Sequence, residues 1–347
     1  MIIDLSEYTE FHLQVGGHTT SKSRLKAYSG SLIKPFQDKD RGLREKAFYD
    51  LVFDQNLSKR GAVVVLNEID TALVRLRPFL PRYYGCLYIA SPPPFLPEDG
   101  EEMNNVSESE CQPPSTNEGE SAVDDGEETK NAESECKPPA IDEGEPPGGY
   151  LVLEDVTWKF HKPCVMDVKL GTRSYEATAS PEKVAYEKSK FPLQEEMGIR
   201  IQGIKVYDPS TDKHIEYDKH FGRLPTSIED VSRTFAHFFQ FLQRPRRQHY
   251  LKKYIERLEE LKSWFKSQDQ VQFIASSLLF VHDQDKYTTE NTSYDLRMID
   301  FAHFRILDKD SKVRDAGEVR GIDTIIECLT ILLHSEEKFD ALWNTAV

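Results

Sequence analysis

Residues 161–171 read HKPCVMDVKLG, a stretch in which Asp167 and Lys169 interrupt an apolar run that Pro163 opens and Gly171 closes. On a β-strand, side chains two residues apart point to the same face. A carboxylate and an ammonium held together in a cleft can orient a hydroxyl and neutralise phosphate charge, which are the two requirements of phosphoryl transfer. The alternative for an isolated Asp-x-Lys pair is a surface ion pair on an edge strand, so the rest of the chain has to decide.

Two later stretches also combine polar side chains with predicted strands. LRMIDFAHF (296–304) predicts Asp300 inside an apolar strand, where an unpaired charge is costly unless it binds a metal or another cation. SSLLF supplies the hydroxyls of Ser276 and Ser277 at the start of a similar strand. Both stretches therefore favour a polar site over a plain core.

Lys34 and Glu45 form a further candidate pair. Lys34 lies near the end of the predicted strand 30–36, and Glu45 follows on the predicted helix 42–53. A lysine placed in this way can direct its ammonium at nucleotide phosphates.

A set of cations follows Lys169. On the predicted helix 180–191, Lys183 and Lys190 are seven residues apart and share one face, two turns from each other. Together with Arg173 and Lys205 they could bind several phosphate groups. A solvated lysine face is the alternative for this helix.

The net charge of −15 arises in one segment. Residues 96–149 hold 17 Asp or Glu, only two basic residues and no aromatic side chain, while the rest of the 347-residue chain carries 42 acidic and 42 basic residues. Such a composition predicts disorder, because it cannot bury enough apolar surface to offset the entropy of ordering. ESECQPPSTNEGE (108–120) recurs as ESECKPPAIDEGE (133–145), which indicates a duplicated insert: a solvated spacer or an acidic segment that binds partners.

Other features exclude whole classes of protein. No apolar run is long enough to cross a membrane, and the acidic start MIIDLSEYTE does not fit a secretory signal, so we expect a cytosolic or nuclear protein. The five cysteines lack metal-type spacing, and we expect them to be reduced.

The periodicity predicts an α+β fold with a small N-terminal lobe, a short connector and a larger C-terminal lobe. Helix 180–191 is expected to have Ser180 as its N-cap, and helix 226–242 is expected to open with the capping-box pair Thr226 and Glu229. Further strands are expected at 86–90, 150–157, 165–171, 199–207 and 273–283, and a further helix at 251–265. The expected domains are 1–95 and 150–157 for the N-lobe with its hinge, 96–149 for the insert and 158–347 for the C-lobe.

Pro163, Asp167, Lys169 and Gly171 fit the PxxxDxKxG signature of the inositol polyphosphate kinases. SSLL (276–279) and IDF (299–301) resemble the other two motifs of that family, in the usual order. The resemblance spans about residues 10 to 340 without the insert, and it implies a two-lobed, kinase-like fold.

By position, the resemblance implies roles for individual residues. Asp167 would orient or deprotonate the attacking inositol hydroxyl, and Lys169 would bridge the inositol phosphate and the transferring group. The implied ATP-binding residues are Lys34, Glu45, Glu154, Asp155, Val156 and Asp300, of which Asp300 would also bind Mg²⁺. The implied substrate-binding residues are Arg41, Lys169, Lys183, Lys190, Lys205 and His303.

Within the family, LPRYYG, LEDVT, KSKFPLQEEMG and IDFAHF resemble the multikinase branch. Lys190 follows Asp167 by only 23 positions, which leaves no room for extra inositol-binding helices. This implies an ATP- and Mg²⁺-dependent kinase that converts inositol tris- and tetrakisphosphates towards the pentakisphosphate. The alternatives are a hexakisphosphate kinase, which makes pyrophosphates, and a nuclear scaffold that acts through the insert. We expect a monomer of the nucleus and cytoplasm, with nuclear protein partners for the insert, no direct nucleic-acid contact and no membrane insertion.

Deleting residues 98–147 separates the catalytic and scaffold alternatives. If the insert is a spacer or a partner-binding segment, the shortened protein is expected to keep its kinase activity within about twofold, because ATP and substrate bind elsewhere. Activity assays and partner pull-down on both proteins measure this. A collapse of activity in a folded deletion variant would contradict the spacer interpretation.

Overall fold

The computed structural model describes residues 7–16, 24–37, 39–53, 68–88, 149–285, 294–307 and 316–334. Apart from Gly149, the acidic insert 96–149 lies outside these residues, as do its predicted disorder and its repeats. No helix within the described ranges has both the length and the apolar character that a membrane span requires. Among the described cysteines, Cys86, Cys164 and Cys328 are free thiols.

Two antiparallel five-stranded sheets form the framework, and they confirm the predicted α+β class. The first sheet has the order β1-β2-β3-β5-β4, with bounds Thr9–Glu10, Lys26–Tyr28, Ser31–Pro35, Tyr150–Glu154 and Tyr83–Leu87. The second has the order β11-β10-β6-β7-β8, with bounds Tyr294–Ile299, Ser277–Asp283, Pro163–Leu170, Ile199–Asp208 and Lys213–Tyr217. A two-stranded ribbon pairs β12 (Arg305–Ile306) with β9 (Val271–Gln272).

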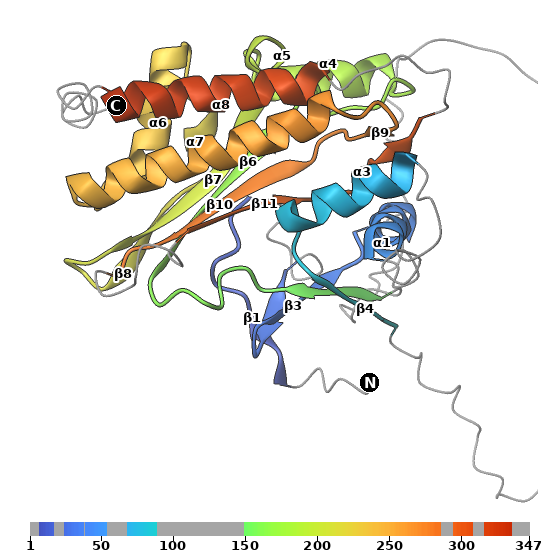
Figure 1. The fold of residues 1–347 in the computed structure, drawn as a ribbon, viewed down its shortest axis with the longest axis horizontal. Coiled ribbons are helices and arrows are strands. Elements are labelled where there is room, and N and C mark those ends of the chain that lie inside the picture. The colour runs from blue at the N-terminus through green and yellow to red at the C-terminus, as the bar shows by residue number, and fades with distance from the viewer. Residues whose placement is uncertain are drawn as a thin grey trace, which may run out of the picture. The chain divides into compact units, whose positions relative to one another are not determined.

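Helices surround the two sheets. Between β3 and β4 in the chain come α1 (Lys39–Phe53) and α3 (Glu68–Leu76), followed by the 3₁₀ turn η4 (Arg77–Phe79). Those near the second are α4 (Pro181–Lys190), α5 (Gln194–Met197), η5 (Phe221–Arg223), α6 (Ile228–Phe238), α7 (Arg244–Lys266) and α8 (Ala316–His334). Helices α6, α7 and α8 lie together along one side of the second sheet (Figure 1).

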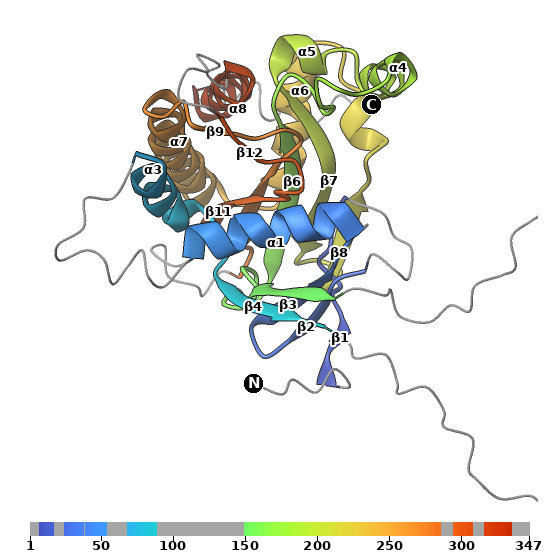
Figure 2. The ribbon, with the colours of Figure 1, turned by 90° about the vertical axis from the view of Figure 1, so that its right-hand side faces the viewer.

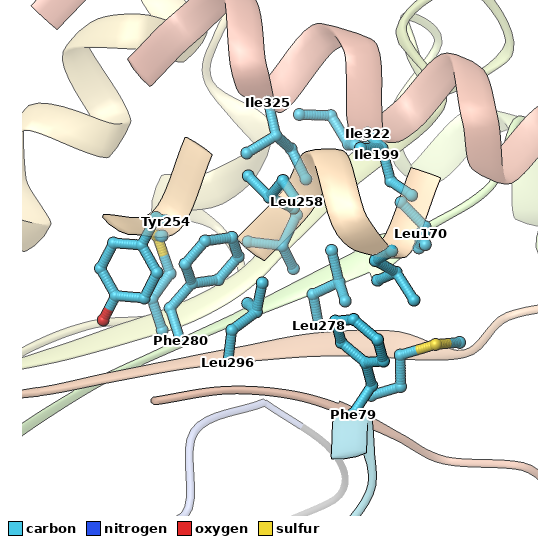
Figure 3. Packing of buried hydrophobic residues seen from close by; sticks show 14 of the residues in the cluster. Phe79, Leu170, Ile199, Tyr254, Leu258, Leu278, Phe280, Leu296, Ile322 and Ile325 are labelled. Atoms are coloured by element: carbon cyan, nitrogen blue, oxygen red, sulfur yellow. The ribbon is translucent and has the colours of Figure 1, made fainter. Parts of the chain in front are cut away.

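The core of the second lobe explains why β6 can carry two charges. Met166, Val168 and Leu170 are fully buried on the helix side of the strand, and Asp167 and Lys169 alternate with them on the other side. Figure 3 shows the same side of the neighbouring strands, where apolar residues point from the sheet toward the helices: Leu278 and Leu296 toward Leu258 and Ile325. The apolar half of β6 therefore fixes the direction of its charged half.

Helix α1 connects the two lobes through aromatic contacts. The ring of Phe48 stacks on Phe301 at 4.1 Å between centroids and meets Phe273 edge-on at 5.6 Å. Trp264 of α7 donates a hydrogen bond to the carbonyl of Ala72 on α3, at 2.8 Å. In Figure 2, α1 runs between the first sheet and the second lobe. The hydrophobic core is thus continuous across both lobes.

Three of the predicted ends of helices and strands are wrong. β11 ends at Ile299, so Asp300 lies just after the strand and not inside it. The N-cap of α6 is Ser227, whose hydroxyl accepts from the Asp230 N–H, and not Thr226. β10 begins only at Ser277. By contrast, Ser180 caps α4 as predicted and accepts a hydrogen bond from the Lys183 N–H.

Replacing Leu278 by alanine is expected to lower the free energy of unfolding by about 2–5 kcal/mol, because the side chain is fully buried between sheet and helices. The matched control is Leu43→Ala on α1, where the leucine is 41% exposed and a change within about 0.5 kcal/mol is expected. Urea denaturation of both variants measures the difference. Equal losses would show that the helix-covered face of the sheet is not the core.

Candidate active site

Lys34 lies between two carboxylates that come from distant parts of the chain. Its Nζ donates to Glu45 Oε1 at 2.8 Å and to Asp300 Oδ1 at 2.5 Å. Burial alone would lower the pKa of Lys34, but the two carboxylates outweigh burial and raise it, so the ammonium is charged. The same oxygen of Glu45 also accepts from the Phe301 N–H at 3.2 Å. β3, α1 and the end of β11 are thereby joined at one point.

The backbone of Asp300 turns its carboxylate into the cleft. Its φ is +66°, in the left-handed region that few residues other than glycine adopt, although aspartate tolerates it better than most. The side chain is 36% exposed instead of enclosed in a strand. Burial of the group opposes ionisation, but Lys34 and then Lys169 outweigh this and lower the pKa of Asp300. Asp300 is therefore an ionised, accessible carboxylate.

Asp167 and Lys169 lie on the same side of the second sheet, as predicted. Asp167 is only 5% exposed, and burial, aided by the charge of Asp300, raises its pKa to about 7 in spite of Lys169. Burial likewise lowers the pKa of Lys169, whose Nζ donates to the carbonyl of Ala275 at 2.9 Å.

The strand register brings these residues together with Asp300. Lys169 is opposite Ser277, and Ser277 is opposite Ile299, the residue that precedes Asp300. The two carboxylates and two lysines therefore belong to one cluster: Asp167, Asp300, Lys34 and Lys169.

Gly16 contacts this cluster, although no motif in the sequence predicts a role for it. Its φ is +73°, and a Cβ at this position would lie 2.9 Å from both Asp167 Oδ2 and the Cβ of Gln202. Only glycine allows the backbone to approach the carboxylate so closely.

An apolar pocket adjoins Lys34 and Asp300. Its walls include apolar side chains from both sheets and from the segment between β1 and β2: Leu32, Leu153, Val165, Leu279 and Ile299, with Val15 and Leu25. The connector Glu154, Asp155 and Val156 also lines this pocket, and its role in ATP binding stays a prediction. A slot of this kind, with a charged end, suits a flat base that carries phosphates.

Hydrogen bonds hold the connector in place. The N–H groups of Glu154 and Asp155 donate to the carbonyls of Arg82 (2.8 Å) and Gly30 (2.9 Å). The Asp155 carboxylate accepts from the backbone and hydroxyl of Thr157 at 2.8 and 2.6 Å, inside the turn. The Val156 N–H makes no hydrogen bond to another described residue, so it is the connector amide that can donate to a ligand.

Lys183 and Lys190 lie on one face of α4, as predicted, and they share one hydrogen-bond partner. Glu187 Oε1 accepts from Lys183 at 2.9 Å and from Lys190 at 2.7 Å. Burial opposes ionisation of Glu187, but the two lysines outweigh it and lower its pKa.

Glu176 is a second carboxylate that holds several cations, and no motif in the sequence predicts it. It accepts from His303 Nδ1 at 2.7 Å and Arg44 Nη1 at 3.1 Å, and it pairs closely with Arg305. The hydrogen bond from His303 and the Arg305 contact lower the pKa of Glu176 to about 2. Arg41 is one turn before Arg44 on α1. No spacing in the sequence signals Glu176, because its partners come from two distant segments, α1 and the stretch 303–305.

Lys205 stands apart from this arrangement. It lies on β7 opposite Val165, but its Nζ donates to the carbonyl of His12 at 2.7 Å and pairs with Glu216 at 3.1 Å. Its substrate role stays a prediction.

Several known proteins are similar to this chain in sequence. The family model described as "Inositol polyphosphate kinase" matches residues 150–330. Human inositol polyphosphate multikinase is 32% identical over 281 residues, which cover 80% of this chain and 51% of the relative. Rat inositol hexakisphosphate kinase 2 is 29% identical over 218 residues, 52% of this chain and 51% of the relative. The chain thus spans about half the length of these relatives.

A solved structure of inositol phosphate multikinase from S. cerevisiae, in complex with ADP and Mn²⁺, is also similar. It has 26% sequence identity and a TM-score of 0.47, and the match covers 54% of this chain and 84% of that one.

Asp167→Asn is expected to raise the free energy of unfolding near pH 8. The unfolded aspartate ionises from its ordinary pKa of 3.8, whereas the folded one ionises only near pH 7, so the wild type loses stability between these values. The gain of the variant should therefore grow from pH 4 to pH 7 and level off above. Denaturation at several pH values measures this.

Asp295→Asn is the matched control with the opposite sign. Burial opposes ionisation of Asp295, but Arg297 and Lys159 outweigh it and lower the pKa, so the amide is expected to destabilise the protein at neutral pH. A gain for Asp167→Asn that stays constant from pH 4 to 8 would contradict the raised pKa.

Proposed function

Because the chain belongs to the inositol polyphosphate kinase family, we propose that it transfers the γ-phosphoryl group of ATP to inositol tris- and tetrakisphosphates, towards the pentakisphosphate. One observation carries the proposal. Asp167 and Lys169 share one side of β6, and the pocket residues Lys34 and Asp300 join them in one cluster. A carboxylate for the hydroxyl and ammonium groups for the phosphates are thus in one place.

The apolar pocket would hold the nucleotide. Leucine and valine side chains from both sheets suit the two faces of adenine, and the Val156 N–H can donate to the base edge. The charged end of the pocket holds Lys34, whose ammonium Glu45 fixes toward the cleft. Lys34 would neutralise phosphate charge there.

Asp300 fits the role of a Mg²⁺ ligand. It is ionised, accessible and at the phosphate end of the pocket. Within the described ranges there is no group of three or more His, Cys, Asp or Glu side chains placed for a metal, so phosphate oxygens would supply the other ligands, as is usual for Mg²⁺ at kinase sites. When bound, Mg²⁺ supplies positive charge to the β- and γ-phosphate oxygens.

The side chains of β6 would carry the transfer itself. The inositol hydroxyl forms a bond to the γ-phosphorus as the bond to the ADP oxygen breaks, and Asp167 takes the hydroxyl proton. A carboxylate with a pKa of about 7 accepts that proton more readily than an ordinary aspartate does. Lys169 would stabilise the negative charge on the transferring group.

The substrate side supports a multikinase over the alternative of a hexakisphosphate kinase. Residues 171–180 connect β6 to α4 without any helix, so this connection contains no additional inositol-binding helix. The multikinase relative also aligns over 80% of this chain, compared with 52% for the hexakisphosphate kinase. Lys183, Lys190 and His303 would bind ring phosphates, and Arg41 and Lys205 are the further candidates.

We also propose a monomer that acts in the nucleus and cytoplasm, with protein partners bound through residues 96–149. The 17 acidic residues of that segment and its duplicated stretch support partner binding. The balanced charge elsewhere gives no basis for nucleic-acid contact.

Lys169→Ala is expected to lower turnover about a hundredfold or more, the scale for losing a preorganised charge-stabilising group. Lys162→Ala is the matched control: Lys162 directly precedes β6 and pairs with Asp212 at the surface, so its loss should leave turnover unchanged. Incubation with ATP and a panel of inositol phosphates, followed by separation of the products, measures both. Near-normal turnover of a folded Lys169→Ala protein would overturn the assignment.

A further inference from the structure

Glu176 holds three side chains that come from distant parts of the chain. Its carboxylate accepts from His303 Nδ1 at 2.7 Å and from Arg44 Nη1 at 3.1 Å, and it pairs closely with Arg305. Arg44 belongs to α1, whereas His303 and Arg305 follow β11. Glu176 itself lies on the connection from β6 to α4, and its side chain is only 19% exposed. It thus joins three segments that carry residues of the proposed site.

The contact with Glu176 fixes a hydrogen on one nitrogen of the His303 ring. The hydrogen bond from His303 and the contact with Arg305 outweigh burial and lower the pKa of Glu176 to about 2, so the carboxylate is ionised and can only accept. Nδ1 of His303 must therefore carry a hydrogen, and the ring cannot flip without losing this bond. Nε2, on the far side of the ring, is then the nitrogen left for a ligand.

The backbone that carries His303 is held by other contacts. The Phe304 N–H donates to the carbonyl of Phe301 at 3.2 Å and closes a turn. The rings of Phe301 and Phe304 both contact Phe48 of α1, at 4.1 and 5.2 Å between centroids. These contacts place the turn, but they do not set the direction of the imidazole. Glu176 sets that direction.

The two arginines keep Glu176 from repelling an anionic ligand. Arg44 and Arg305 both contact its carboxylate, so these three side chains together carry one positive charge in excess. A carboxylate without such partners would weaken the binding of a phosphate nearby, because like charges repel. The arginines therefore allow an anion to orient His303 beside an anionic substrate.

We infer that Glu176 is a positioning residue of the substrate site, which turns His303 so that Nε2 faces the inositol polyphosphate and which acts on binding through His303. The inference rests on the proposed function and adds a residue to its substrate side. An imidazole that is already oriented loses less conformational entropy when a phosphate binds than one that rotates freely. A contact made equally before and during phosphoryl transfer changes KM and leaves turnover as it is.

Steady-state kinetics of the full chain with ATP and an inositol tetrakisphosphate test this. Glu176→Gln, which keeps the shape of the side chain but removes its charge, is expected to raise the KM for the inositol phosphate about tenfold. The rise is bounded by the one charge-assisted hydrogen bond that His303 would make to the substrate. Turnover and the KM for ATP should stay within about twofold. Glu176→Asp, which keeps the charge, should recover part of the loss.

A double-mutant cycle distinguishes positioning from a purely structural role. His303→Ala is expected to raise the same KM to a similar degree, and adding Glu176→Gln to His303→Ala should raise it no further. Effects that add would show that Glu176 acts independently of His303, and they would overturn the inference. If Glu176→Gln does not fold, the same cycle with Glu176→Asp decides.

Glu195→Gln is the matched control, because Glu195 is an exposed carboxylate of α5 that pairs with Lys188 at the surface. Its KM values should equal those of the wild type. A Glu176→Gln protein with an equally unchanged KM for the inositol phosphate would overturn the role of Glu176. A wild-type protein that binds ATP but phosphorylates no inositol phosphate would instead overturn the proposed substrate class, and this inference with it.

Discussion

The site depends on the alternation of buried apolar side chains and charged side chains along β6. Met166, Val168 and Leu170 are held under the helices of the second lobe, so Asp167 and Lys169 cannot turn away from the cleft without exposing three buried side chains. Burial of Asp167 costs free energy, which its raised pKa records. The apolar half of the same strand offsets that cost. Preorganisation of the charged pair is therefore supplied by ordinary core packing.

The nucleotide half of the site uses a different kind of support. Lys34 comes from the first sheet, while Asp300 follows the last strand of the second sheet, and Glu45 of α1 is bonded to Lys34 and to the backbone beside Asp300. The stack of Phe48 on Phe301 fixes α1 at the same place. The aromatic contact thus sets the position of the helix, and the ion pairs set the direction of the ammonium.

The sequence predicted the parts of the site that depend on local periodicity. The two-residue spacing of Asp167 and Lys169 and the seven-residue spacing of Lys183 and Lys190 translate directly into shared faces. Asp300 was placed wrongly, because an apolar run does not reveal the positive φ that ends its strand. Glu176 was missed because its contacts with Arg44, His303 and Arg305 form only when distant segments meet, which no single stretch of sequence contains.

The contact of Gly16 with Asp167 has a consequence for how the carboxylate is solvated. The backbone at Gly16 covers Asp167 Oδ2, and the same segment is tied to β7 where Lys205 holds the carbonyl of His12. The segment that contains Gly16 thus helps to exclude water from the Asp167 carboxylate. The raised pKa of Asp167 therefore depends in part on a segment about 150 residues earlier in the chain, and a methyl group at position 16 would be enough to disturb it.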